Sequence, residues 1–168
     1  MIVVADTGPV HYLVLCGQVD LLHPLFGSLI IPAAVQRELL HAHAPAAVQA
    51  WASALPGWVK VCSPDDASRF DNLGPGERQA IALALEIGAD FLLIDETLGR
   101  RTAVQAGVAV KGTLGVLEEA ARRGLVDLRV VIQRLKTTGI FLAPEILDAA
   151  LERDRVRRQS IRRNEPEP

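Results

Sequence analysis

Four acidic residues are the part of this sequence best suited to chemistry. They are Asp6, Glu38, Glu77 and Asp95. Carboxylate oxygens are the ligands that Mg²⁺ and similar hard cations prefer, and a few of them suffice when water and a phosphate complete the shell. Such ions activate water and stabilise the leaving oxygen of a phosphodiester. If folding gathers these four acids, they form a site for a divalent cation.

Two of the four acids follow apolar runs that are typical of buried parallel strands. Asp6 follows residues 2–5, and Asp95 follows residues 91–94. In an open parallel sheet the carboxyl ends of the strands lie along one edge, where ligands bind. We therefore expect Asp6 and Asp95 to reach the same edge.

Each acid also has a purely structural interpretation. Asp6 would cap the helix after it, and Asp95 with Glu96 would open another helix. Glu77 lies in the first turn of its predicted helix, where the macrodipole favours an acid. Glu38 would be a solvated helix residue. These interpretations stay open for each residue alone, and only the joint pattern favours a metal site.

The elements that must position these acids alternate along the chain between short strands and helices. This alternation predicts a layered α/β domain with a parallel sheet. Strands are expected at 2–5, 28–31, 58–61, 91–94 and 108–110. Helices are expected within 10–26 (two short ones) and at 33–40, 46–55, 77–87, 97–105, 113–123, 127–137 and 144–157.

The domain organisation follows from the same pattern. Residues 1–125 are predicted to form the main domain, and residues 126–157 a helical extension. Residues 158–168 are rich in Arg, Glu and Pro, and this composition predicts a disordered tail.

Composition excludes several classes of protein. Hydrophobic residues make up 49% of the chain, but no apolar stretch reaches the roughly 18 residues of a membrane span. The first residues lack a basic region, so a secretory signal is not expected. Cys16 and Cys62 are isolated, which favours the reducing cytoplasm. Aromatic residues are only 4%, so few are available to stack on bases.

The formal net charge is -2 and is unevenly spread. Six arginines and four acids give residues 152–168 a net charge of +2. These arginines would bind the phosphates of an RNA backbone, form a solvated tail or bind a partner. Arg100 and Arg101 follow Asp95 on a predicted helix, where they would contact RNA phosphates or form an ordinary solvated face.

The order of several segments resembles the PIN-domain ribonucleases, especially their toxin-like prokaryotic branch. The matching segments are 3–9, 32–39, 73–84, 92–96 and 110–117. The resemblance covers about residues 1–125. It implies a three-layer α/β/α fold with a central parallel sheet of about four to five strands, followed by C-terminal helices.

The resemblance also implies an activity. It implies cleavage of single-stranded RNA with Mg²⁺ or Mn²⁺, leaving a 5′-phosphate and a 3′-hydroxyl. Carried over by position, the metal-binding and catalytic acids are Asp6, Glu38, Glu77 and Asp95. Thr7 becomes a supporting polar residue, and Glu96 is either an extra ligand or a helix-start acid.

Two positions depart from the family's pattern. Glu77 stands where the wider family often has Asp, and Leu93 where it often has Thr or Ser. Because this hydroxyl is missing, a non-catalytic module that binds RNA or protein stays an alternative function. A phosphotransfer domain with a strand-end phosphoacceptor is a weaker alternative, because only one acid stands beside the first strand.

The resemblance to toxins implies a cognate antitoxin protein that blocks the acidic edge. The amphipathic C-terminal helices either pack on the core or form a homodimer seam. Their apolar residues are Ile140, Leu142, Ile146, Leu147 and Leu151.

Overall fold

The centre of the molecule is a sheet of five parallel strands. A computed structural model describes residues 1–164, with side chains described for residues 1–161. The strands are β1 (Val3–Ala5), β2 (Leu29–Ile31), β3 (Val59–Val61), β4 (Phe91–Leu93) and β5 (Val110–Lys111). Their order across the sheet is β3-β2-β1-β4-β5, and all pairs are parallel. The predicted parallel sheet is confirmed.

Both faces of this sheet are covered. On β1, Val3 and Ala5 belong to one hydrophobic core and Val4 to a second, because successive side chains point to opposite faces. All three side chains are completely buried. Burial on both faces explains why the strand segments are continuous apolar runs.

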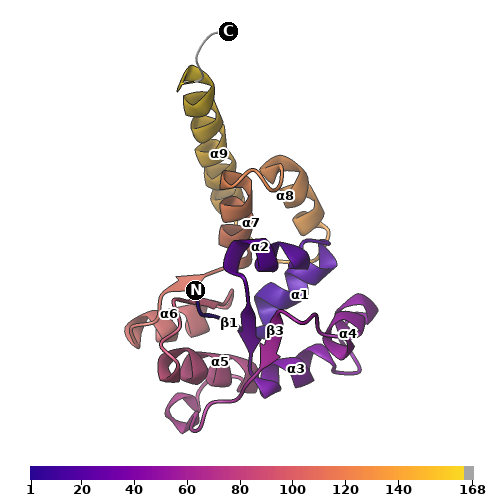
Figure 1. Cartoon of the computed structure of the whole chain (residues 1–168), viewed down its shortest axis with the longest axis vertical. Helices are drawn as coiled ribbons and strands as arrows, with labels where there is room; N and C mark the ends of the chain where they lie inside the picture. Colours follow the sequence, from indigo (N-terminus) through magenta and orange to yellow (C-terminus); the bar gives the residue numbers. More distant parts are fainter. Residues whose placement is uncertain (165–168) are drawn as a thin grey trace.

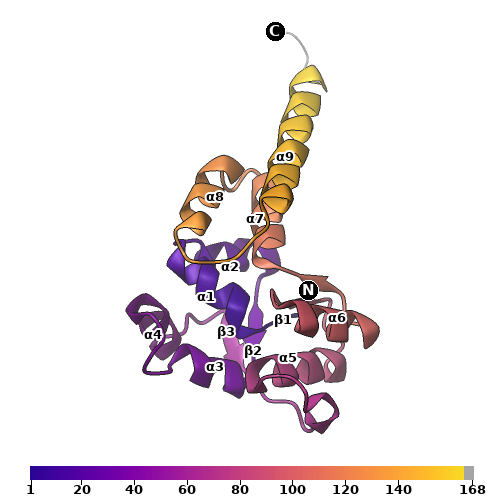
Figure 2. The ribbon, with the colours of Figure 1, turned by 180° about the vertical axis from the view of Figure 1, so that it is seen from behind.

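Helices form the two outer layers. One layer packs on the larger core and contains α1 (Thr7–Leu15), α2 (Leu22–Phe26), α3 (Ala33–Leu39), α4 (Ala46–Ser53), α7 (Thr113–Arg122), α8 (Leu128–Lys136) and α9 (Pro144–Asn164). The other contains α5 (Pro75–Glu86) and α6 (Thr97–Gln105), with the 3₁₀ turn η2 (Ser68–Phe70). A further 3₁₀ turn, η1 (Val19–Leu21), precedes α2. The predicted three-layer α/β/α fold is confirmed, and Figures 1 and 2 show α8 and α9 at the end of the molecule away from α5.

The strand order reverses direction between β1 and β4. The chain leaves β1 toward β2 and β3 on one side, then crosses back to β4 and continues to β5 on the other. In such sheets the diverging connections leave a crevice at the carboxyl ends of the two central strands. Asp6 and Asp95 therefore stand at the position where this topology opens a binding site.

The C-terminal helices share the larger core. Leu135 of α8 is 1% exposed, and Ala150 of α9 is completely buried. The five apolar residues predicted for this region divide between core and surface. Ile140, Leu142, Leu147 and Leu151 pack against the core, whereas Ile146 stays half exposed.

Helix α9 is longer than the sequence indicated. It continues to Asn164, so residues 158–164 are helical where a disordered tail was predicted. The physical reason is a set of ion pairs one helical turn apart, of Arg155 with Glu152 and of Arg157 and Arg158 with Asp154. The rest of the predicted tail, 165–168, lies outside the described residues.

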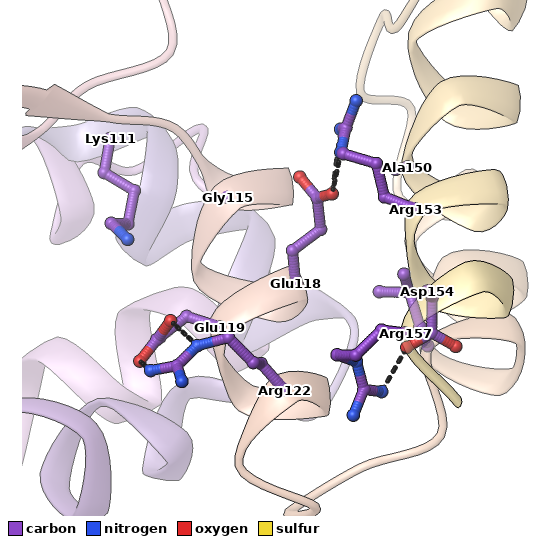
Figure 3. A pocket seen from close by; sticks show the side chains of 10 residues that line it. Lys111, Gly115, Glu118, Glu119, Arg122, Ala150, Arg153, Asp154 and Arg157 are labelled. Atoms are coloured by element: carbon purple, nitrogen blue, oxygen red, sulfur yellow. Dashed lines mark hydrogen bonds and ion pairs between the residues drawn. The ribbon is translucent and has the colours of Figure 1, made fainter. Parts of the chain in front are cut away.

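Four arginines of α9, at positions 153, 155, 157 and 158, form ion pairs within the described part of the chain. Arg153 lies 2.8 Å from Glu118 of α7, across a pocket of about 340 Å³ between the two helices (Figure 3). Arg157 pairs with Asp154 at the same pocket, as Figure 3 also shows. The Arg153–Glu118 ion pair attaches α9 to α7, whereas the Arg157–Asp154 pair lies within α9. Within the described part of the chain, no helix is both long and apolar enough to cross a membrane.

Candidate functional site

Asp6 is the central side chain of the site. It directly follows β1, and its backbone N–H donates to the Leu93 carbonyl oxygen of β4 at 2.9 Å. The residue is 5% exposed. It stands at the N-cap of α1, but its side chain makes no capping hydrogen bond. Its Oδ1 is buried without a hydrogen-bond partner.

The surroundings of Asp6 disfavour its negative charge. Burial raises the pKa of Asp6 to about 7, and the charges of Glu77 and Glu38 raise it further. The backbone N–H groups of Thr7 and Gly8 act in the opposite direction but are outweighed. A buried, unpartnered carboxylate costs free energy, and a cation beside it would remove that cost.

Glu38 is held at the site by two neighbours. It lies on α3, after β2, and its Oε2 accepts from the Thr7 hydroxyl. Its Oε1 accepts from the backbone N–H of Gly76 at 2.8 Å, in the first turn of α5. A Cβ added at Gly76 would lie 2.8 Å from Oε1. Only glycine lets α5 approach the carboxylate this closely.

Asp95 is fixed by Thr113, the first residue of α7. Its Oδ1 accepts from the Thr113 backbone N–H at 2.7 Å, and its Oδ2 accepts from the Thr113 hydroxyl at 2.6 Å. Burial raises the pKa of Asp95, while the two Thr113 hydrogen bonds and the nearby Arg100 charge oppose the rise. Thr113 itself is completely buried.

Glu77 and Glu96 have different roles. Glu77 lies in the first turn of α5, and burial raises its pKa, as do the charges of Glu96 and Glu38. Glu96 is exposed and caps α6, accepting from the Gly99 backbone N–H at 2.8 Å. Glu96 therefore begins α6, and its role as an extra metal ligand stays a prediction.

One cleft brings the four predicted acids together. Its volume is about 550 Å³. The residues lining it are Asp6, Thr7, Gly8, Tyr12, Glu38, Gly74, Glu77, Asp95, Glu96, Ile140 and Phe141. It opens at the carboxyl ends of β1 and β4, as the strand order requires.

The cleft suits a divalent cation chemically. Its donors are carboxylate oxygens, and Asp6 Oδ1 lacks any other partner. Among residues 1–161, no three acidic, histidine or cysteine side chains are already grouped as metal ligands. Glu38 and Asp95 carry hydrogen bonds, but a carboxylate has about four lone-pair positions, so both keep free ones.

The two predicted phosphate contacts differ in position. Arg100 donates through Nη1 to the Ile94 carbonyl oxygen at 2.8 Å, close to Asp95. It lines a second cleft, next to the first. Arg101 is exposed on α6 and lines neither cleft.

Three side chains at or beside the acidic cleft were not predicted from the sequence. They are Tyr12, Thr113 and Phe141. Thr113 was assigned only to a helix cap, although it follows β5, the neighbour of β4. Strand order is the signal that would have placed its hydroxyl beside Asp95. Phe141 lies in a connection between two helices, where the pattern carried no signal.

The fold and the cleft together define an α/β protein with an acidic site at a topological switch point. A family model described as a PIN domain matches residues 2–155. This chain therefore belongs to the PIN-domain family, whose members are generally nucleases and typically use divalent metals. No curated protein matches the chain, and no solved structure matches it.

Proposed function

We propose that this PIN-domain chain is a metal-dependent endoribonuclease that cuts single-stranded RNA. One observation carries the proposal: Asp6, whose Oδ1 is buried without a hydrogen-bond partner, lines a cleft together with four further acids. Burial raises the pKa values of Asp6, Glu77 and Asp95, and the charges of neighbouring carboxylates also raise those of Asp6 and Glu77, which marks an excess of negative charge around these two acids. A divalent cation is the simplest group that relieves it.

The proposed roles follow from how each acid is held. Asp6 and Asp95 stand at the two strand ends and would hold the principal Mg²⁺ or Mn²⁺. Glu38 and Glu77 would complete the site, with Glu38 oriented by Thr7 and Gly76. When bound, the ion supplies water activation and neutralises charge on the leaving oxygen.

The protein's own contribution to hydrolysis is position and charge. Hydrolysis joins a water oxygen to phosphorus and breaks the bond to the 3′ oxygen, leaving a 5′-phosphate and a 3′-hydroxyl. The acids lie on separate elements that the sheet holds together, so their oxygens are arranged before the substrate arrives. Such pre-organisation is a main source of catalysis.

The biological setting is proposed from the resemblance to the toxin-like branch. In that setting the chain acts in the cytoplasm as the toxin of a toxin–antitoxin pair. A cognate antitoxin would cover the acidic cleft. A homodimer is a further possible assembly, and light scattering after size-exclusion chromatography would measure it.

Removal of one carboxylate tests the function. We expect Asp6→Asn to abolish cleavage of single-stranded RNA in Mn²⁺ or Mg²⁺, because the amide cannot donate a charged oxygen to the ion. Mn²⁺ should raise the melting temperature of the wild type but not that of Asp6→Asn. The matched control is Asp148→Asn, an exposed acid on α9 that lines no part of the cleft.

Undiminished cleavage in EDTA would contradict the metal-dependent mechanism. Binding of RNA without cleavage, and without a tight Mn²⁺ site by calorimetry, would instead identify a non-catalytic RNA-binding module.

A further inference from the structure

One aromatic side chain is presented to solvent at the edge of the acidic cleft. Phe141 is 92% exposed, the highest exposure of any large hydrophobic residue in the described chain. Leaving a phenyl ring in water costs free energy. The ring lines both the acidic cleft and the second cleft, so it stands between them.

The loop around Phe141 is fixed by its neighbours. Ile140 and Leu142, on either side, pack against the larger core. The Thr138 hydroxyl donates to the Leu135 carbonyl oxygen at 2.6 Å, and Gly139 makes the turn with a φ of 82°. The backbone is therefore held while the Phe141 ring alone faces outward.

The second cleft is less acidic than the first, because basic side chains line it as well as acids. It has a volume of about 610 Å³, and two basic side chains, Arg100 and Lys111, line it. Within residues 1–161 neither forms an ion pair with a carboxylate. Its remaining acid, Glu118, is paired with Arg153 (Figure 3). Asp95 lines both clefts and marks where they meet.

We infer that Phe141 is a base-stacking residue that sets the path of single-stranded RNA from the acidic cleft into the second cleft, toward Arg100 and Lys111. The inference rests on the proposed nuclease function and names the part of the substrate that the protein holds beside the cleaved bond. A base next to that bond stacks on Phe141, and the following phosphate lies at Arg100 and Lys111.

The chemistry of a single strand fits this order of groups. Each nucleotide offers an apolar base face and a phosphate charge, and aromatic platforms beside basic grooves recognise them. The guanidinium of Arg100 keeps N–H groups besides the one given to Ile94, and these can hold a phosphate. Bases in a duplex are already stacked on their neighbours, so the ring selects single strands.

The test distinguishes base stacking on Phe141 from a merely apolar contact, and it measures RNA binding separately from RNA cleavage. Binding is measured with full-length Asp6→Asn protein, to prevent cleavage, and short single-stranded RNAs that carry 2-aminopurine at successive positions. Phe141→Ala in this background should weaken binding about fivefold to tenfold, the lower part of the range for one stacked base. It should also abolish the fluorescence quenching at one position.

Further variants supply the controls. Phe141→Trp should keep both binding and quenching, whereas Phe141→Leu should lose the quenching. Val130→Ala, at a half-exposed apolar residue of α8 outside both clefts, should change neither. Arg100→Gln should weaken binding and reduce its salt dependence.

The outcomes distinguish this inference from the proposed function. If the wild type cleaves RNA but Phe141→Ala binds and cleaves equally well, the stacking role is overturned and the ring belongs to a protein contact. If RNA quenches 2-aminopurine at Phe141 but is never cleaved, the stacking role holds and the nuclease function fails. If RNA is neither bound nor cleaved, both are overturned.

Discussion

At the scale of single residues, the site depends on side chains that orient the acids as much as on the acids themselves. Thr113 donates both its backbone N–H and its hydroxyl to Asp95. Burial raises the pKa of Asp95, and these two hydrogen bonds hold the rise in check. Thr113 therefore favours the charged form of Asp95 and opposes the effect of burial.

Thr113→Val removes this hydroxyl and keeps the shape of the side chain. The pKa of Asp95 should rise further, because its charged form loses a charge-assisted hydrogen bond worth about 1.5 kcal/mol or more. Metal binding needs the deprotonated form. The pH midpoint of Mn²⁺-dependent cleavage should therefore move upward by about one pH unit.

Thr113→Ser is the matched control for this prediction. It keeps the hydroxyl, and its pH profile should stay close to that of the wild type. A loss of activity in Thr113→Val that is equal at all pH values would assign Thr113 a packing role instead.

The sequence indicated the four acids, and the family resemblance indicated Thr7 as a support, but neither indicated the contacts of Thr113 and Gly76. Asp6 and Asp95 could be found because each ends an apolar run, and that signal is local. Thr113 and Gly76 could not, because their contacts join residues that are 18 and 38 positions apart. The hydroxyl missing at Leu93, which is completely buried, has its counterpart in Thr113 from the neighbouring strand connection.

At the scale of elements, the close approach of α3 and α5 shapes the acidic cleft. The Gly76 backbone N–H donates to Glu38, and Gln79 Oε1 accepts from the Ala34 backbone N–H at 3.2 Å. Both contacts tie the first turn of one helix to the other. The interpretation of Glu38 as a solvated helix residue does not account for its contact with Gly76.

Gly76→Ala tests that approach. The added Cβ would lie within 3 Å of the Glu38 carboxyl carbon and oxygens. The Glu38 carboxylate, as the end of a flexible side chain, is then the group most easily displaced, and its displacement would break the hydrogen bonds from Thr7 and Gly76. Both the melting temperature and the affinity for Mn²⁺ should fall, measured by thermal unfolding and by calorimetry.

Gly57→Ala is the control for added bulk, because a Cβ there would meet nothing within 4 Å. We expect little change in either quantity. If Gly76→Ala were as stable as the wild type and bound Mn²⁺ equally well, α3 and α5 would have room to separate. Their close approach would then not be required for the site.

The positions of the helices and strands were predicted from the sequence more completely than the residues at which they end. Strand and helix positions followed from apolar runs and from breakers such as Gly88 and Gly107, which adopt positive φ. The end of α9 could not be predicted in this way, because the composition of its charged segment alone indicates disorder. The ion pairs of Asp154 with Arg157 and Arg158 depend on helical spacing, which composition does not report.

At the scale of the whole molecule, the C-terminal helices belong to the same core as the sheet. The family match extends to residue 155, which includes α8 and part of α9. Leu128, Ile132 and Leu135 of α8 are at most 1% exposed. Helices α8 and α9 follow the predicted boundary at residue 125, and they therefore contribute to the same core as residues 1–125. The same helices carry the loop that presents Phe141.

Leu135→Ala tests whether these parts fold together. Truncating a buried leucine costs about 2–5 kcal/mol, and in a shared core this loss should destabilise the entire protein. We expect a single cooperative urea transition, with its midpoint lowered equally whether circular dichroism or tryptophan fluorescence is followed. Trp51 and Trp58 lie before β4, far along the chain from α8, so they report on the other part of the core.

Val130→Ala, at an exposed position of α8, is the control and should change stability by no more than about 0.5 kcal/mol. A two-step transition, in which helicity is lost while tryptophan fluorescence stays native, would instead show that residues 126–157 form an extension that unfolds separately.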